Sequence, residues 1–442
     1  MSALKKIVKS ISDRTSQQEF FASQLKLAFH VLFVAAPMGV IVGLGIAVYD
    51  YLVNTFLWGR FVNTFSPEFL CLIPTVGMFL TGLVMYCFRV PSPSMADEVV
   101  KAYHGKEGGI DYKTAFPKLA ASLTTMGFGA SAGMEGASKW LGATITSFLQ
   151  IQINKWKKLK ILQGSVETSL LAGAAAGIGA IFRAPLTGAI MGVESPYKKD
   201  LAHESLIHGL VAAATSYATF ILLRPNTPYF PIKFHYVLNY RDIFYSLILG
   251  LLAGLTSHLF LNLLYSIKRV LNAWKIHLLW KYLLGGLLLS LIAFISYKYM
   301  GEAATLHAGL PVANSFLNGD YTLHVCIFLF VAKLCATAIT FGAGGVGGLF
   351  VPSATIGAAL GAICDILFTP SQPGVFTLIG IAAFTGASYN SLLFAAVFVA
   401  EATGSPALLV PGLLASSVAF LVSSEFSNSP SQKKQRVEQA LY

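Results

Sequence analysis

Two glycine-rich stretches, one in each half of the chain, decide the fold: Gly127-Phe-Gly-Ala-Ser-Ala-Gly-Met-Glu-Gly-Ala137 and Gly342-Ala-Gly-Gly-Val-Gly-Gly-Leu-Phe-Val-Pro352. Downstream, each half has a second matching stretch, Phe182–Glu194 and Tyr389–Glu401, that runs twelve residues from an aromatic residue to a glutamate. Two matches in the same order predict an internal duplication of a membrane protein. Around the first pair, four identities recur at equal offsets: Gly133/Gly348, Ser138/Ser353, Gly142/Gly357 and Ala143/Ala358.

The composition is that of a membrane protein. Of its 442 residues, 55% are hydrophobic and 12% are charged, and the mean hydropathy is +0.66. Soluble domains carry about 25% charged residues. Apolar runs long enough to span a bilayer recur along the sequence, so a soluble enzyme with a signal peptide or a single anchor is excluded. We expect an all-α polytopic membrane protein.

Basic residues gather between the apolar runs and at both ends of the chain. With 31 Lys+Arg against 20 Asp+Glu, the formal net charge is +11, but no basic patch is interleaved with stacking aromatics as nucleic-acid binding requires. Short basic loops mark the cytoplasmic side. We therefore predict a multi-pass protein of the plasma (inner) membrane with both termini in the cytoplasm, and no nucleic-acid partner. The five cysteines have no metal-ligand spacing, so neither a metal nor another cofactor is expected.

Each glycine-rich stretch opens a helix, and a helix N-terminus presents free N–H donors with a partial positive charge. Two such ends meeting at membrane depth would hold a small anion, although the glycines could instead only permit close helix packing. Glu135 favours the first alternative, because a carboxylate inside a membrane is costly and by default functional. It would compete with an anion for the helix end and leave when protonated. Glu135 is therefore a candidate gate.

The same residues carry a family resemblance. Gly133-Met-Glu-Gly-Ala137 resembles the G-K/R-E-G-P signature of the CLC chloride channels and transporters, and Gly348-Leu-Phe-Val-Pro352 matches that family's G-x-F-x-P pattern. Pro93-Ser-Met-Ala-Asp97 lies where the family has G-S-G-x-P. The resemblance implies an inverted-repeat fold of about eighteen tilted, partly re-entrant helices, and a homodimer with one anion path per subunit. It divides the chain into segments 1–24, 25–424 (halves of about 25–224 and 239–424) and 425–442, the last expected to be helical.

The resemblance also implies the site residues. Glu135 is the gating glutamate, with Gly133 and Gly136 beside it at the helix end. The remaining chloride-binding groups are the Ser94 hydroxyl, the backbone amides of Leu349 and Phe350, and Ser429, which stands where the family has a tyrosine in the pattern Tyr-Pro-Ser-Gln. Tyr389 and Tyr442 are poor substitutes for that tyrosine by position. The family's internal proton glutamate would immediately follow Glu194, where this chain has Ser195.

These departures leave the transport mode open. Because Ser195 cannot carry a proton as a glutamate does, and Ser429 leaves a wider inner gate, we expect chloride transport that is channel-like or weakly proton-coupled. The alternative is a proton/chloride antiporter, which Glu135 favours. A third reading, an intramembrane transferase, lacks the His-Asp pair or Ser/His dyad that such an enzyme needs.

Three further residues have open roles. Glu194 and Glu401 end apolar runs, and we expect them to cap or bridge helices rather than carry protons. Arg183 either attracts anions at the inner mouth of the path or snorkels to the membrane interface.

Overall fold

The computed structural model describes residues 20–225, 227–274, 276–370, 372–423 and 427–436. Within these residues the fold is helical, with two isolated backbone bridges and no named strand. In the described part of the chain, eight helices are long and apolar enough to cross a membrane, from Phe20–Thr64 to Pro406–Ser423. The expected all-α polytopic architecture is confirmed.

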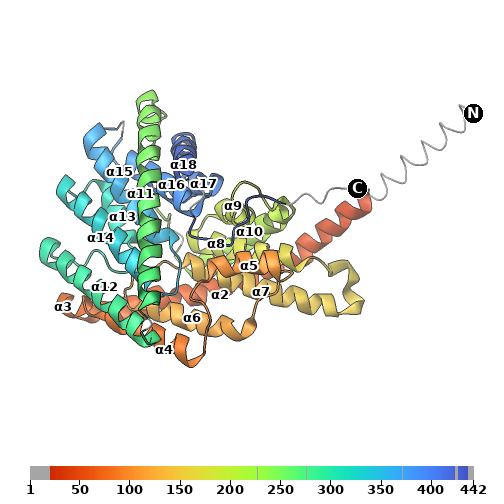
Figure 1. Cartoon of the computed structure of the whole chain (residues 1–442). Coiled ribbons are helices and arrows are strands. Elements are labelled where there is room, and N and C mark those ends of the chain that lie inside the picture. The colour runs from red at the N-terminus through yellow and green to blue at the C-terminus, as the bar shows by residue number, and fades with distance from the viewer. Residues whose placement is uncertain (1–19, 226, 275, 371, 424–426, 437–442) are drawn as a thin grey trace, which may run out of the picture.

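Each half of the sequence contributes its own set of helices; in Figure 1, α16–α18 lie in the upper part of the view and α4, α6 and α7 in the lower part. The first half contains η1 (Val31–Ala35), α2 (Ala36–Asp50), η2 (Tyr51–Phe61), η3 (Val62–Thr64), α3 (Pro67–Leu70), α4 (Ile73–Cys87), α5 (Ala96–Gly105), α6 (Tyr112–Gly127), α7 (Glu135–Lys155), η4 (Lys157–Leu162), α8 (Val166–Phe182), α9 (Pro185–Glu194), η5 (His203–Ser205) and α10 (Leu206–Leu223).

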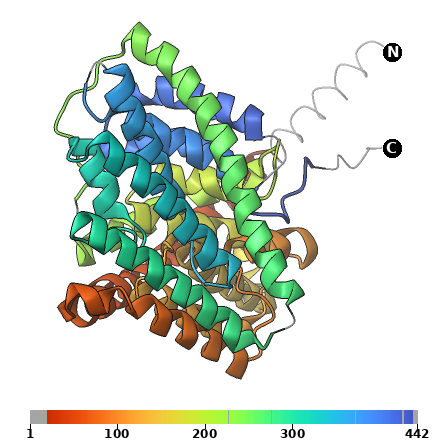
Figure 2. The same ribbon diagram turned by 60° about the vertical axis from the view of Figure 1, so that its left-hand side comes forward.

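The second half begins with α11 (Tyr240–Ala273), the long light-green helix that crosses the molecule diagonally in Figure 2. It continues with α12 (Leu278–Met300), α13 (Leu310–Asn318), α14 (Leu323–Gly342), α15 (Phe350–Phe368), α16 (Val375–Tyr389), α17 (Leu393–Thr403), η6 (Pro406–Leu408) and α18 (Leu409–Ser423).

The two glycine-rich segments pack in matching ways. Helix α7 lies against α8, and α15 lies against α16 in the same way. A Cβ atom at Gly142 would overlap the carbonyl oxygen of Gly173, and one at the matching Gly357 would overlap that of Gly380. The repeated glycines therefore let each helix pair approach closely.

The two glutamates that end the second repeated stretch cap helices of the opposite half. Glu194, at the end of α9, accepts hydrogen bonds from the backbone N–H groups of Leu392, Leu393 and Phe394 at the start of α17. Glu401, in α17, accepts from the N–H groups of Leu186 and Thr187 at the start of α9. Each carboxylate satisfies helix-end donors that have no partner within their own helix. The expected capping roles are confirmed.

The expected helix over 425–442 is wrong for the described residues 427–436, which form bends, one turn and one backbone bridge; 424–426 and 437–442 lie outside the described residues. The backbone of 427–436 forms hydrogen bonds with other parts of the chain instead. Lys198 N–H donates to the Lys433 carbonyl at 2.8 Å, and Lys433 N–H donates to the Pro196 carbonyl at 3.2 Å. Asp97 accepts from Ser431 N–H at 2.9 Å. These partners satisfy the backbone without a helix.

Candidate functional site: an anion path at paired helix ends

The N-termini of α7 and α15 are joined by a backbone clamp. Gly133 N–H donates to the Gly348 carbonyl and Gly348 N–H donates to the Gly133 carbonyl, both at 2.7 Å. These are the two glycines that the duplication aligned with each other. The clamp holds both helix starts together, as an anion site built from two helix ends requires.

Glu135 places its carboxylate on the α15 end of this clamp. Its Oε1 accepts a short hydrogen bond from the Phe350 N–H, and a longer one of 3.3 Å from the Val351 N–H. The residue is 2% exposed. A Cβ atom at Gly348 would overlap the carboxyl carbon of Glu135, so the glycine leaves the space that the carboxylate fills. The charged oxygen thus sits where a small anion would find the same donors.

The other carboxylate oxygen, Oε2, is buried and has no hydrogen-bond partner among the described residues. Glu135 also lines a cavity of about 610 Å³ together with Trp58, Arg183, Tyr229, His307 and Asn314. We call it the Arg183 cavity. A carboxylate held by one oxygen, with the other beside open space, has somewhere to move.

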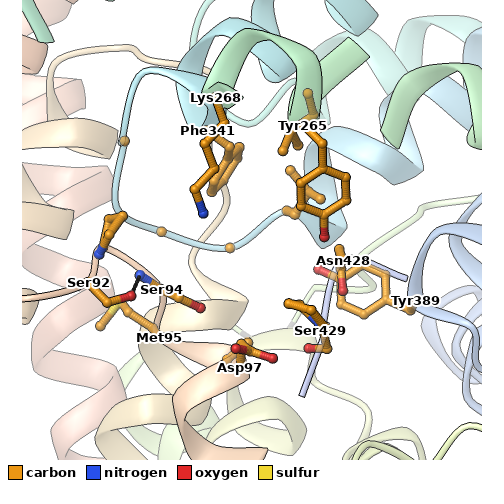
Figure 3. Close-up of a pocket in the computed structure, with 18 of the residues that line it drawn as sticks. Ser92, Ser94, Met95, Asp97, Tyr265, Lys268, Phe341, Tyr389, Asn428 and Ser429 are labelled. Atoms are coloured by element: carbon orange, nitrogen blue, oxygen red, sulfur yellow. Dashed lines mark hydrogen bonds between the residues drawn. The ribbon is translucent and has the colours of Figure 1, made fainter. Parts of the chain in front are cut away.

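A second cavity, of about 200 Å³, lies on the side of the clamp where the non-helical segment 427–436 docks. Ser94, Leu349 and Ser429 line it, as Figure 3 shows for the two serines. We call it the Ser94 cavity. The structure therefore brings together Ser94, Leu349 and Ser429 of the predicted site, while Glu135 faces the Arg183 cavity and Phe350 joins the two through its backbone.

The predicted glycines and Phe350 act through the backbone. A Cβ atom at Gly136 would lie 2.5 Å from the Gly347 carbonyl oxygen, so the side chain is absent because the two helix starts touch. The Phe350 ring is fully buried, with ring centroids 4.9 Å from both Phe182 and Phe394. Of Phe350, the backbone N–H is the group that contacts the Glu135 carboxylate.

Lys118 holds the loop that carries Ser94, and sequence reasoning missed it. Its fully buried ammonium donates to the Ser94 carbonyl at 3.1 Å, pairs with Glu98 and lies 4.8 Å from the centroid of the Trp140 ring. A buried lysine keeps its charge only with such partners. The sequence did contain a signal for this role, because Lys118 lies within the apolar part of α6.

Tyr389 also lies in the Ser94 cavity, although its position in the sequence had argued against it. It ends α16, its hydroxyl is within reach of the Leu349 backbone and the Asn428 side chain, and its ring centroid is 5.6 Å from that of Phe350. Figure 3 shows Tyr389 beside Asn428 and Ser429. A tyrosine hydroxyl therefore reaches this site from a different helix.

Ser195 lies beside a buried lysine. A small enclosed space of about 20 Å³ is lined by Ser195, Lys139, Tyr389, Ser429 and Gln432, which is room for about one water molecule. Lys139, in α7, is 2% exposed. No hydrogen bond or ion pair is recorded for its ammonium within the described parts of the chain. Its position was visible in the sequence, but its nearness to Ser195 was not.

Sequence comparisons with known proteins point to one family. Residues 76–424 match the family described as "Voltage gated chloride channel". The chain is 26% identical over 423 residues to the voltage-gated ClC-type chloride channel ClcB of Escherichia coli K12, covering 91% of this chain and 96% of the relative.

Solved structures confirm the CLC-type fold. A CLC-type fluoride/proton antiporter superposes with a TM-score of 0.77 at 23% identity, over 91% of this chain and 98% of that one. A slow cyanobacterial Cl⁻/H⁺ antiporter gives 0.76 at 20% identity, over 89% and 94%. With the family match extending across both helix-end motifs, the chain belongs to the voltage gated chloride channel (CLC) family.

Proposed function

We propose that this protein exchanges chloride for protons across the membrane, with Glu135 as the group that serves both ions. The observation that carries the proposal is the Glu135 carboxylate on the Phe350 and Val351 amides. A charged carboxylate there excludes chloride. A protonated carboxyl group is held more weakly, because a neutral acid is stabilised less by the partial positive charge and the N–H donors of the helix end. Release of the side chain by a proton is therefore linked to entry of the anion.

The antiporter alternative has more support than the channel-like reading that Ser195 and Ser429 favoured. The two superposed structures described above are both of proton-coupled antiporters. Lys139 supplies a titratable group beside Ser195, so the loss of a glutamate there does not remove every proton carrier. Tyr389 narrows the Ser94 cavity that Ser429 alone would leave wide. Membership in this family leaves the transferase alternative without support.

In the proposed cycle, chloride enters the Ser94 cavity and meets the Ser94 hydroxyl and the Leu349 amide. It passes to the Phe350 and Val351 amides when Glu135 is protonated from the Arg183 cavity. Loss of that proton returns the carboxylate to the amides and displaces chloride. Lys139 would carry the proton on through the one-water space toward Ser195. We place the Ser94 cavity and segment 427–436 on the cytoplasmic side, and two identical subunits each with its own path.

The test is a reversal-potential measurement on purified protein in liposomes with opposed chloride and pH gradients. A coupled exchanger lets a chloride gradient drive protons uphill, and its reversal potential departs from the chloride equilibrium potential. A reversal potential that follows chloride alone, with no uphill proton movement, would favour the channel-like reading. Chloride efflux should also exceed fluoride efflux, because hydroxyl and amide donors replace the hydration of chloride more easily than that of fluoride. Faster fluoride efflux would refute the assignment of Ser94.

A further inference from the structure

The Arg183 cavity contains a cluster of unsatisfied polar atoms. Four of its lining residues have a buried side-chain atom with no hydrogen-bond partner among the described residues: Glu135 Oε2, Arg183 Nε, His307 Nε2 and Asn314 Oδ1. Buried polar atoms are normally paired, so each such atom needs an explanation. Four around one cavity of about 610 Å³ indicate that the cavity holds a polar ligand.

The charges around the cavity favour an anion. The Arg183 guanidinium donates through Nη1 to the Thr227 carbonyl at 2.6 Å and to the Thr227 hydroxyl at 2.9 Å, and it makes no ion pair with a described carboxylate. Asp50, which also lines the cavity, already pairs with Arg224 and accepts from Asn54 at 2.7 Å. Of the two acidic residues in this cavity, Asp50 is therefore already paired and Glu135 is the proposed gate, while Arg183 keeps an unused donor and its positive charge.

The opposite wall supplies donors from the second half. Burial lowers the pKa of His307 to about 4, so its ring is neutral and offers one N–H. Behind it the Lys333 ammonium donates to the His307 carbonyl at 2.6 Å. Helix α13 begins at Leu310, which lines the cavity, and its first N–H groups lack partners within the helix. The Asn314 amide can present either end to a ligand.

We infer that the Arg183 cavity is an anion-collecting site, in which Arg183 holds a small monovalent anion close to Glu135 before the gate moves. The sequence immediately around Glu135 lacks a positive charge that could attract an anion to this cavity. The position before Glu135, basic in the resembling signature, is the apolar Met134 here, and Met134 lines the same cavity. Arg183, held in the left-handed region at φ 55° after the end of α8, brings the missing charge from another element. The inference rests on the proposed chloride transport.

The experiment measures chloride flux through proteoliposomes as a function of chloride concentration, at low ionic strength and with an impermeant gluconate salt added. Arg183→Gln should raise the KM for chloride by up to about ten-fold at low ionic strength, since a charge that concentrates counter-ions acts on capture. Its kcat should be unchanged. Arg183→Lys should restore most of the wild-type KM, and added salt should abolish the difference by screening.

Two control variants separate charge from structure. Thr227→Ala removes one hydrogen bond to Arg183 but keeps the cation, and should leave KM unchanged. Thr227 lies in the segment 224–239 that links α10 to α11, and Arg241 lies just after that segment, in the first turn of α11. Arg241→Gln removes one exposed positive charge there and should also leave KM unchanged. Size-exclusion profiles verify folding, and if Arg183→Gln does not fold, the salt dependence of the wild-type KM and the Lys variant remain as the test.

Three results would overturn the inference: an Arg183→Gln KM equal to wild type, a wild-type KM that is independent of ionic strength, or equal defects in Arg183→Gln and Thr227→Ala. The last would assign Arg183 to holding the loop. Wild-type protein that carries no chloride would instead refute the proposed function, and the collecting site would fall with it.

Discussion

Glu135 and Glu194 are both buried carboxylates at helix N-termini, yet they are held very differently. Glu194 uses both oxygens: Oε1 accepts from the Leu392 and Leu393 N–H groups, and Oε2 accepts from the Phe394 N–H and the Ser391 hydroxyl. Glu135 uses only Oε1, and its Oε2 is buried without a described partner beside a cavity.

The difference shows how one interaction can serve two purposes. A carboxylate that satisfies four donors is a permanent part of the helix cap, because moving it would leave all of them unpaired. A carboxylate that satisfies two donors, with space beside it, can be exchanged for another anion of similar size. Both glutamates therefore lie at a helix end. They differ in that Glu194, the structural residue, has both oxygens hydrogen-bonded, whereas Glu135, the candidate gate, has only one with a partner among the described residues.

The largest expected effect comes from breaking the permanent cap. Glu194→Ala leaves three backbone N–H groups unpaired, and each unpaired group costs about 1 kcal/mol or more, so the variant should lose at least ~3 kcal/mol of stability. Thermal unfolding in detergent measures this. Glu135→Ala is the matched comparison: added chloride should restore its melting temperature, because the anion can occupy the vacated amides. Equal chloride rescue of Glu194→Ala would erase the distinction.

The next effect concerns gating. Wild-type chloride flux should rise as pH falls, because acid neutralises Glu135 and frees the Phe350 and Val351 amides. Glu135→Gln mimics the neutral state and should carry chloride with a flat pH profile, while still preferring chloride to fluoride. Glu135→Asp keeps the charge but shortens the reach to the amides, so flux at neutral pH should exceed wild type. Full wild-type pH dependence in the Gln variant would make Glu135 a structural carboxylate like Glu194.

A smaller effect is expected from Lys139, which shares the one-water space with Ser195. Lys139→Met should reduce proton movement per chloride while chloride flux continues, because the proposed proton carrier is gone and the anion-binding amides remain. Ser195→Ala is the control and should keep coupling. Parallel chloride-electrode and pH-electrode recordings from one liposome sample measure the ratio. Unchanged coupling in Lys139→Met would remove the lysine from the proton route.

The smallest effect concerns the docked segment 427–436. Hydrogen bonds from the Arg436 and Leu201 N–H groups lower the pKa of Asp200 below its ordinary 3.8. Because its pKa is lowered, ionised Asp200 stabilises the docking of segment 427–436 above about pH 4. This stabilisation is lost as pH falls through the folded-state pKa. Asp200→Asn should modestly increase proteolysis of segment 427–436 at neutral pH. It should also abolish the further increase in proteolysis that acid causes in the wild-type protein. Asp111→Asn, at the cap of α6, should not alter cleavage there.

The sequence predicted the parts of the fold that depend on local pattern. Apolar runs gave the spanning helices, and the aligned Gly133 and Gly348 turned out to be hydrogen-bonded to each other. The non-helical conformation of segment 427–436 was missed because it is set by partners such as Asp97 and Pro196. Those residues are distant in sequence and have no periodicity in common with it.

For the site, family position was a good guide to backbone groups and a poor one to side chains. The Leu349 and Phe350 amides lie at the helix end as expected, but the hydroxyl beside Leu349 comes from Tyr389, which sequence position had discounted. Arg183 lines the cavity of Glu135 rather than the Ser94 cavity. Lys118 and the nearness of Lys139 to Ser195 were missed, because one sequence cannot show which helix faces meet.

The clamp between Gly133 and Gly348 has a thermodynamic consequence. Because the two helix ends hold each other through reciprocal 2.7 Å hydrogen bonds, the amides that would receive an anion are already in place before it arrives. Little ordering of the protein then opposes binding. Titration calorimetry on Glu135→Ala should accordingly record chloride binding with a small heat-capacity change, the signature of a rigid receptor that buries little new apolar surface.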